Sequence, residues 1–146
     1  MTALYEQDEI RFLYPENWEL DNREDESTPW SVSVHSPGGA FWSIVVHDQG
    51  TDLSDLADAS LDALRQEYPE SFFESESVHD RYGGQGVEGY DAEFFYLDFL
   101  ISAKIRAMDV ENRPCIVLFQ SESSDFEKLE LVFRAITESL YQAKIK

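Results

Sequence analysis

Basic residues are scarce in this chain, which has 146 residues and only 11 lysines and arginines against 30 aspartates and glutamates. The formal net charge is −19 at pH 7, and all of that excess lies in residues 1–100. Such a negative surface repels phosphate backbones and anionic lipid headgroups, which argues against nucleic-acid and membrane binding. The charge favours a basic protein partner, although a need for solubility or adaptation to a salty cytoplasm would produce the same composition.

Cysteine is almost absent as well. Cys115 stands alone, so no disulfide can form within the chain, and its apolar neighbours predict burial on a strand. Nowhere do 18 consecutive apolar residues occur, and the first residues contain neither a basic nor an apolar leader segment. We therefore expect a cytoplasmic protein.

The common signatures of catalysis are missing too. The chain has no Gly-x-Ser-x-Gly elbow and no Gly-Lys-Ser/Thr phosphate loop. The glycines Gly83, Gly84 and Gly86 lead into a strand, not a helix, which indicates a hairpin turn. We expect no catalytic residue, no cofactor and no metal, and hence a protein that is not an enzyme.

Three histidines keep an alternative open. His35, His47 and His79 could bind a metal together with nearby aspartates, but their spacings match no known ligand signature. The alternative to a binding protein is a small-molecule binder or hydrolase that uses a cleft between sheet and helix, with one of these histidines as base. Single replacement of each by alanine would test it, since a general base contributes about 10²- to 10⁴-fold in rate.

Apolar and aromatic residues, by contrast, are plentiful at 42% and 14% of the chain, which is too rich for a disordered polypeptide. The length suits one domain over residues 1–146. Period-2 patterns predict strands, and 3.6-residue periods predict helices. The strands are expected at 10–14, 30–36, 40–47, 72–80, 86–97, 101–110 and 115–121, and the helices at 52–68 and 124–140.

Several local signals refine this outline. Asp52 is a candidate N-cap of the first helix, and Ser124 with Glu127 forms a possible capping box for the second. Residues 16–29 show no apolar period and are expected to form an exposed, charged loop. The order of elements predicts an α+β fold in which two amphipathic helices flank an antiparallel sheet of about six to seven strands.

Three segments resemble the PsbP-like superfamily. The run Phe12-Leu-Tyr-Pro-Glu-Asn-Trp18 is similar to the family's Phe-x-Tyr-Pro-x-x-Trp opening, and Gly86-Val-Glu-Gly-Tyr90 also matches. The chain ends, as the family does, with the strand Ile116–Ser121 and an amphipathic helix. The superfamily includes photosystem accessory proteins, a Ran-binding nuclear-transport factor and DcrB-like bacterial proteins. The resemblance implies a single α/β/α sandwich domain and a role in binding or assembly.

These observations predict a non-enzymatic binding module, adaptor-like or chaperone-like, with an acidic surface for a basic protein whose identity the sequence leaves open. The predicted protein-binding residues surround the acidic loop and are Asp21, Glu24, Asp25, Glu26 and Trp30. An aromatic side chain at the rim of a negative patch is a suitable anchor. A core role is the alternative for Trp30, since it shares a strand face with Val32 and Val34.

Overall fold

The computed structural model describes residues 1–7, 9–23, 30–69 and 72–141. Their secondary structure follows the expected order with two additional strands. The strands are β1 (Thr2–Gln7), β2 (Ile10–Pro15), β3 (Glu19–Arg23), β4 (Trp30–His35), β5 (Phe41–Val46), β6 (Phe73–Tyr82), β7 (Gln85–Tyr96), β8 (Phe99–Val110) and β9 (Arg113–Glu122), and the helices are α1 (Leu53–Glu67) and α2 (Ser123–Ser139).

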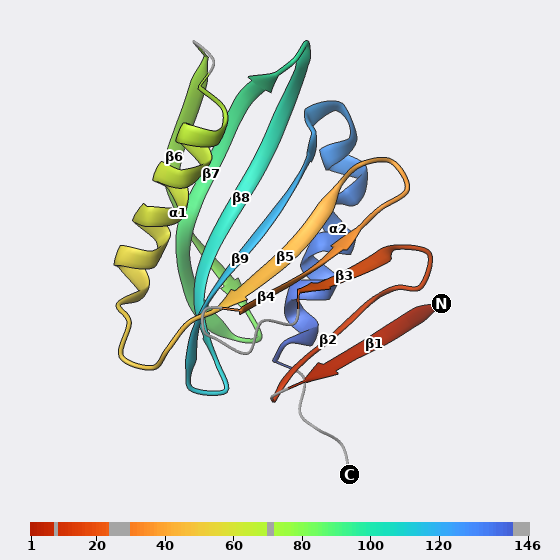
Figure 1. The fold of residues 1–146 in the computed structure, drawn as a ribbon, viewed down its shortest axis with the longest axis vertical. Helices are drawn as coiled ribbons and strands as arrows, with labels where there is room; N and C mark the ends of the chain where they lie inside the picture. The colour runs from red at the N-terminus through yellow and green to blue at the C-terminus, as the bar shows by residue number, and fades with distance from the viewer. Residues whose placement is uncertain (8, 24–29, 70–71, 142–146) are drawn as a thin grey trace.

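An antiparallel sheet of seven strands, in the order β3-β4-β5-β9-β8-β7-β6, forms the centre of the described structure (Figure 1). The strands β1 and β2 form a separate two-stranded sheet. Most neighbours in the large sheet are joined by short hairpins, and β5 pairs with β9 across the intervening hairpins. This confirms the expected α+β class with an antiparallel sheet flanked by two helices.

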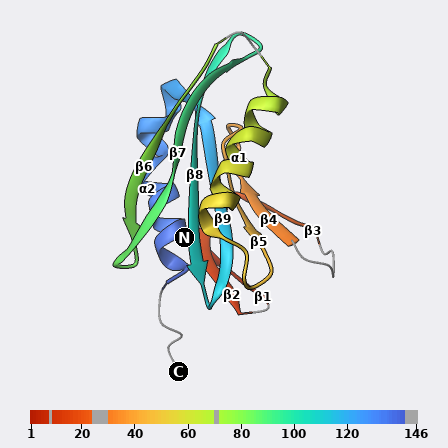
Figure 2. The ribbon, with the colours of Figure 1, turned by 90° about the vertical axis from the view of Figure 1, so that its left-hand side faces the viewer.

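The two helices lie on opposite faces of the sheet (Figure 2). Helix α1 packs over β7, β8 and β9, while α2 packs on the other face over β9, β8 and β2. Because successive side chains of a strand point to opposite faces, β8 supplies Ala103 and Ile105 to the core under α1 and Met108 to the core under α2. No helix among the described residues is both long and apolar enough to cross a bilayer.

The larger core lies under α2 and the β1–β2 hairpin. The ring of Trp42 is fully buried, with its centroid 4.7 Å from that of Phe12. Its Nε1 donates a hydrogen bond of 2.9 Å to Oγ1 of Thr137 on α2. Cys115 is also fully buried here, as its apolar run predicts. The hairpin therefore serves as a cover for one end of the sheet.

Two sequence-based expectations were wrong in detail. Residues 19–23 are not loop but the edge strand β3, which pairs with β4. An exposed edge strand needs no apolar alternation, so the pattern did not reveal it. The capping box is also wrong, because α2 begins directly after β9 with Glu122 as N-cap and no side-chain cap. By contrast, the Asp52 side chain accepts a hydrogen bond of 3.1 Å from Asp55 N, as expected of an N-cap.

Candidate functional site: an acidic groove beside an apolar hairpin tip

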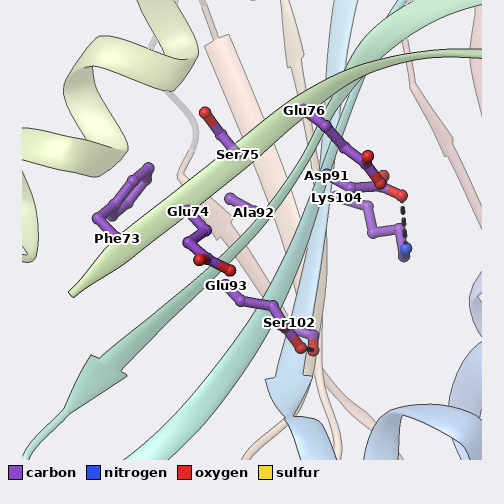
Figure 3. Close-up of a pocket in the computed structure, with 9 residues that line it drawn as sticks. All are labelled: Phe73, Glu74, Ser75, Glu76, Asp91, Ala92, Glu93, Ser102 and Lys104. Carbon is purple, nitrogen blue, oxygen red and sulfur yellow. Dashed lines mark hydrogen bonds and ion pairs between the residues drawn. The ribbon is translucent and has the colours of Figure 1, made fainter.

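The face of the sheet that carries α2 is only partly covered. Beyond α2, the strands β6, β7 and β8 line a hollow of about 680 Å³, which we call the acidic groove (Figure 3). Its lining residues are Phe73, Glu74, Ser75, Glu76, Asp91, Ala92, Glu93, Ser102 and Lys104. Four of these carry carboxylates and one carries an amine.

The charges of the groove are only partly neutralised. Nζ of Lys104 lies 2.8 Å from Oδ2 of Asp91, and Ser102 Oγ donates a 3.3 Å hydrogen bond to Glu93. Glu74 and Glu76 extend from β6 into solvent and have no ion-pair partner among the described residues. In Figure 3 the side chain of Ser75, between them on the strand, points to the other side. The groove therefore presents a net negative wall.

A network of ion pairs forms the inner end of the groove. Arg106 is 4% exposed, and its guanidinium lies 3.1 Å from Asp80 and 2.9 Å from Asp91. Arg134 of α2 lies 2.9 Å from the other oxygen of Asp80. These residues line a second hollow of about 270 Å³ that shares Asp91 and Lys104 with the groove. The network joins β6, β7 and β8 to α2 and so holds the groove's walls in place.

The network also sets protonation states. Burial alone would raise the pKa of Asp80, but the hydrogen bonds from Arg134 and the Arg81 backbone and the charge of Arg106 lower it to about 2. Burial raises the pKa of Tyr82 to about 12, so this phenol stays neutral beside the ionised Asp80. These charged groups are paired with one another, as in a structural network of ion pairs.

Apolar side chains stand on both faces of the β7–β8 hairpin where it turns beyond the outer end of the groove, at the top of Figure 1, with Phe95 on the groove's face and Tyr96 and Phe99 on the α1 face. We call this cluster the apolar tip; its members and their exposed fractions are Phe95 (40%), Tyr96 (50%), Leu97 (68%) and Phe99 (52%). The ring of Phe95 lies 5.4 Å from that of Phe72. Leu97 has a φ of 56°, in the left-handed region that favours glycine or asparagine. An exposed leucine in such a conformation suggests a role in binding.

The residues that the sequence singled out for binding lie elsewhere. Asp21 is exposed on β3, at the opposite edge of the sheet from β6. Glu24, Asp25 and Glu26 lie outside the described residues. Trp30 is 8% exposed and belongs to the larger core, which leaves little of it for a partner to contact. A binding role for this acidic segment stays a prediction.

The sequence analysis did not identify the acidic groove or the apolar tip. The signal for the groove was a polar stretch in an expected strand, since Glu74 to Ser77 are four consecutive exposed residues. The signal for the tip was the opposite pattern, in which apolar residues stand on both sides of the turn Leu97–Asp98 and at its first position. Turns are normally polar, so apolar residues there call for an explanation.

The histidines are dispersed over the structure. His35 pairs with Phe41 across the β4–β5 hairpin, and its Nε2 lies 3.0 Å from Ser33 Oγ at the exposed surface. His47 follows β5, and burial lowers its pKa. His79 lines a hollow of about 170 Å³ between α1 and the β6–β7 pair. Among the described residues, no three His, Cys, Asp or Glu side chains gather as metal ligands would.

Comparison with protein-family models and with curated proteins gives no match. Solved structures do match. A Pseudomonas aeruginosa protein of unknown function, PA94, is 12% identical with a TM-score of 0.55, and the match covers 99% of each chain. Cyanobacterial PsbP from Synechocystis is 10% identical with a TM-score of 0.63, over 94% of this chain and 90% of that one. Together with the observed topology, these matches show that the chain has the PsbP-like fold.

Proposed function

We propose that this chain is a non-enzymatic protein-binding module that takes a basic segment of a partner protein into the acidic groove. The observation that carries the proposal is the continuity of two surfaces. Four carboxylates against one amine line the groove. At its outer end, on the same face of the sheet, Phe95 lies against Phe72, and the exposed Leu97 stands at the turn beyond it. Such a surface fits a partner segment in which positive and apolar side chains are close together.

Charge supports this choice of partner. Lys104 is already paired with Asp91, so Glu74, Glu76 and Glu93 remain as uncompensated negative groups. The net charge of −19 adds a long-range field that attracts cationic proteins and repels anionic ones. The groove would supply the specific contacts, and the overall charge would speed the encounter.

The apolar tip supports a protein as partner in preference to a small ion. Aromatic residues are enriched in the cores of protein interfaces, where they contribute most of the binding energy. Phe95, on the face of the groove, and Leu97, at the turn, are 40% and 68% exposed in the free chain. A partner that covered them would remove apolar surface from water. Added salt does not weaken this apolar contribution to binding.

The test is capture of partners from the native cytosol by three forms of the protein at low and high salt. The first is the wild type, and the second is the groove variant Glu74→Lys/Glu76→Lys. The third is a control, Asp62→Lys/Glu67→Lys, which makes the same change in charge at exposed positions of α1 on the other face of the sheet. A further variant with Glu24, Asp25 and Glu26 changed to serine tests the acidic segment.

A stoichiometric partner that the wild type and the control retain, and that the groove variant and high salt release, is the expected result. Its loss by the serine variant alone would assign binding to the acidic segment after β3. Equal loss by the groove variant and the control would mean that the overall charge, and not the groove, attracts the partner. That outcome would overturn the proposal.

One observation favours a second candidate, a small-molecule binder or hydrolase with a histidine base. His79 lines the hollow beside α1 together with Asp58 and Tyr90, whose hydroxyl donates a 2.5 Å hydrogen bond to Asp58. A ligand in this hollow would shift the ring resonances of His79 in a screen of small metabolites. A rate that falls about 10²-fold or more in His79→Ala would support a base, whereas an unchanged spectrum across the screen would count against this candidate.

A further inference from the structure

Strand β6 is an unpaired edge of the large sheet. It has ten residues and pairs with β7 on one side, and no described strand pairs with its other side. Figure 1 shows it as the outermost strand next to β7. Its middle is exposed on both faces, at Glu74, Ser75, Glu76 and Ser77, although Arg65 of α1 donates a 3.3 Å hydrogen bond to Ser75 Oγ. A long edge of this kind presents a row of free backbone N–H and C=O groups.

A second copy of the chain is a poor occupant of this edge. Two β6 strands paired antiparallel about Ser75 would bring Glu74 and Glu76 of one copy against those of the other, and like charges on neighbouring strands are destabilising. Charges on an edge strand are a common protection against such self-pairing. The same two carboxylates favour a strand that carries positive charges at matching positions.

We propose that the partner's basic segment binds as an additional strand along the free edge of β6. This inference rests on the proposed function and specifies how the segment is held. Backbone hydrogen bonds to the edge would supply affinity, while alternate side chains would supply specificity. The added strand would extend the floor of the acidic groove and run toward the apolar tip.

The alternation of β6 specifies the partner's pattern. On the groove side of the sheet, Glu74, Glu76 and Val78 of β6 follow one another at every second position, and Phe72, just before the strand, lies against Phe95 on the same side. Phe72 and Val78 are half-buried apolar residues at the two ends of this row. The matching strand has the pattern apolar-x-basic-x-basic-x-apolar. The pattern is symmetric, so it serves a parallel or an antiparallel strand.

The side of β6 that faces away from the groove places few restrictions on the partner's side chains. There Ser75 and Ser77 are exposed and uncharged. The intervening positions of the partner therefore suit threonine or serine, which favour strands and carry no charge. Phe73 limits this side at one end, where the guanidinium of Arg65 lies 4.9 Å above its ring.

The probe is a capped peptide, Leu-Thr-Lys-Thr-Lys-Thr-Leu, and the readout is hydrogen exchange of the β6 backbone amides by NMR. Its control, Leu-Lys-Thr-Lys-Thr-Thr-Leu, has the same composition but places the lysines and leucines on opposite faces of a strand. With the first peptide, every second amide between residues 73 and 79 should exchange at least about tenfold more slowly. The control should bind about 2- to 30-fold more weakly, because two cross-strand ion pairs are lost.

A charge exchange tests the same contacts in a folded variant. The protein Glu74→Lys/Glu76→Lys should lose affinity for the lysine peptide and gain it for Leu-Thr-Glu-Thr-Glu-Thr-Leu. Such a reversal shows that the variant is folded and that residues 74 and 76 determine which charge the protein prefers in its partner. The Asp62→Lys/Glu67→Lys protein should keep the wild-type preference for the lysine peptide.

Three outcomes would overturn strand addition. They are a peptide that binds without slowing alternate β6 amides, equal affinity for the two lysine peptides, and no binding of either. None of these contradicts the proposed function, which depends on capture of a protein partner through the groove. If the groove variant captures its partner as well as the control does, the proposed function itself fails.

Discussion

Gly89 shows how one residue maintains the inner wall of the groove. It lies opposite Arg106 on β8, and a Cβ added there would overlap the carbonyl group of Ile105. The Arg106 side chain also donates to the carbonyl oxygens of Tyr90 and Ile105. The missing side chain at Gly89 thus allows the buried guanidinium and the backbone to approach each other closely.

Replacement of this residue, Gly89→Ala, should lower the free energy of unfolding by about 1–3 kcal/mol, as overpacking does. The matched control is Gly86→Ala on the same strand, where an added Cβ meets nothing within 4 Å. That change should stay within about 0.5 kcal/mol. Urea denaturation of both variants provides the measurement, and equal stabilities would show that the space at Gly89 is not needed.

A substitution at Leu97 should affect partner binding and folding stability in different ways. Its left-handed backbone costs an L residue about 1–2 kcal/mol, and asparagine tolerates this conformation better. The Leu97→Asn variant should therefore be as stable as the wild type or up to about 1 kcal/mol more stable. It should also bind the captured partner about tenfold more weakly, since an apolar contact is lost. Calorimetry measures both quantities.

The control for this prediction is Leu131→Gln. Leu131 is the most exposed leucine of α2, at 79%, and lies away from the tip. Its replacement should leave the affinity unchanged. A Leu97 variant that loses stability but keeps its affinity would contradict a binding role for the tip.

At the scale of elements, the ion pairs of Asp80 connect the sheet to α2. Asp80 contacts Arg106 of β8 and Arg134 of α2, and the Arg134 guanidinium lies 4.4 Å from the Tyr82 ring centroid. Arg134 also donates to the backbone oxygen of Arg81 at 2.9 Å. The β6–β7 hairpin is thereby held against α2, and with it one wall of the groove.

Acid should release this connection. The folded-state pKa of Asp80, about 2, lies below its ordinary value of 3.8, so the stabilisation is complete above pH 4 and is lost as the pH falls through 2. In Asp80→Asn we expect unfolding to be easier by about 1–3 kcal/mol at pH 7, because Arg106 stays buried with one carboxylate fewer. The difference from the wild type should shrink between pH 4 and pH 2.

Urea titrations of the two proteins at several pH values measure this difference. Glu127→Gln, an exposed carboxylate on α2, serves as control and should change stability little at any pH. A constant gap between wild type and Asp80→Asn down to pH 2 would show that the charge of Asp80 does not contribute.

For the whole molecule, the net charge of −19 opposes folding while it favours a basic partner. Raising KCl from 0.1 M to 1 M shortens the Debye length from about 10 Å to about 3 Å. The melting temperature of the free protein should rise by a few degrees, because repulsion between carboxylates is screened. The affinity for the partner should fall over the same range.

Differential scanning calorimetry and titration of the partner measure both effects in one salt series. A melting temperature that does not change would mean that the acidic groups are too far apart to repel one another. A salt-insensitive complex would mean that apolar contacts, including those of the tip, dominate binding.

The sequence alone predicted much of the architecture. Period-2 patterns located the main strands, the stripe from Leu53 to Tyr68 located α1, and apolar neighbours predicted the burial of Cys115. These features are local, because a side chain's burial on a strand or helix follows from its place in a short repeat. The opening motif around Phe12 and the order of elements also indicated the PsbP-like fold.

The tertiary structure decided the candidate site. The edge strand β3 lacks an apolar period, so nothing local distinguishes it from a loop, and the expected strand at 72–80 does not show by itself that its middle is an uncovered edge. The pairing of Asp80 with Arg106 joins residues 26 positions apart, and that with Arg134 joins residues 54 apart. Sequence determined which faces are apolar, but only the packing of α2 over part of one face decided which carboxylates stay exposed to a partner.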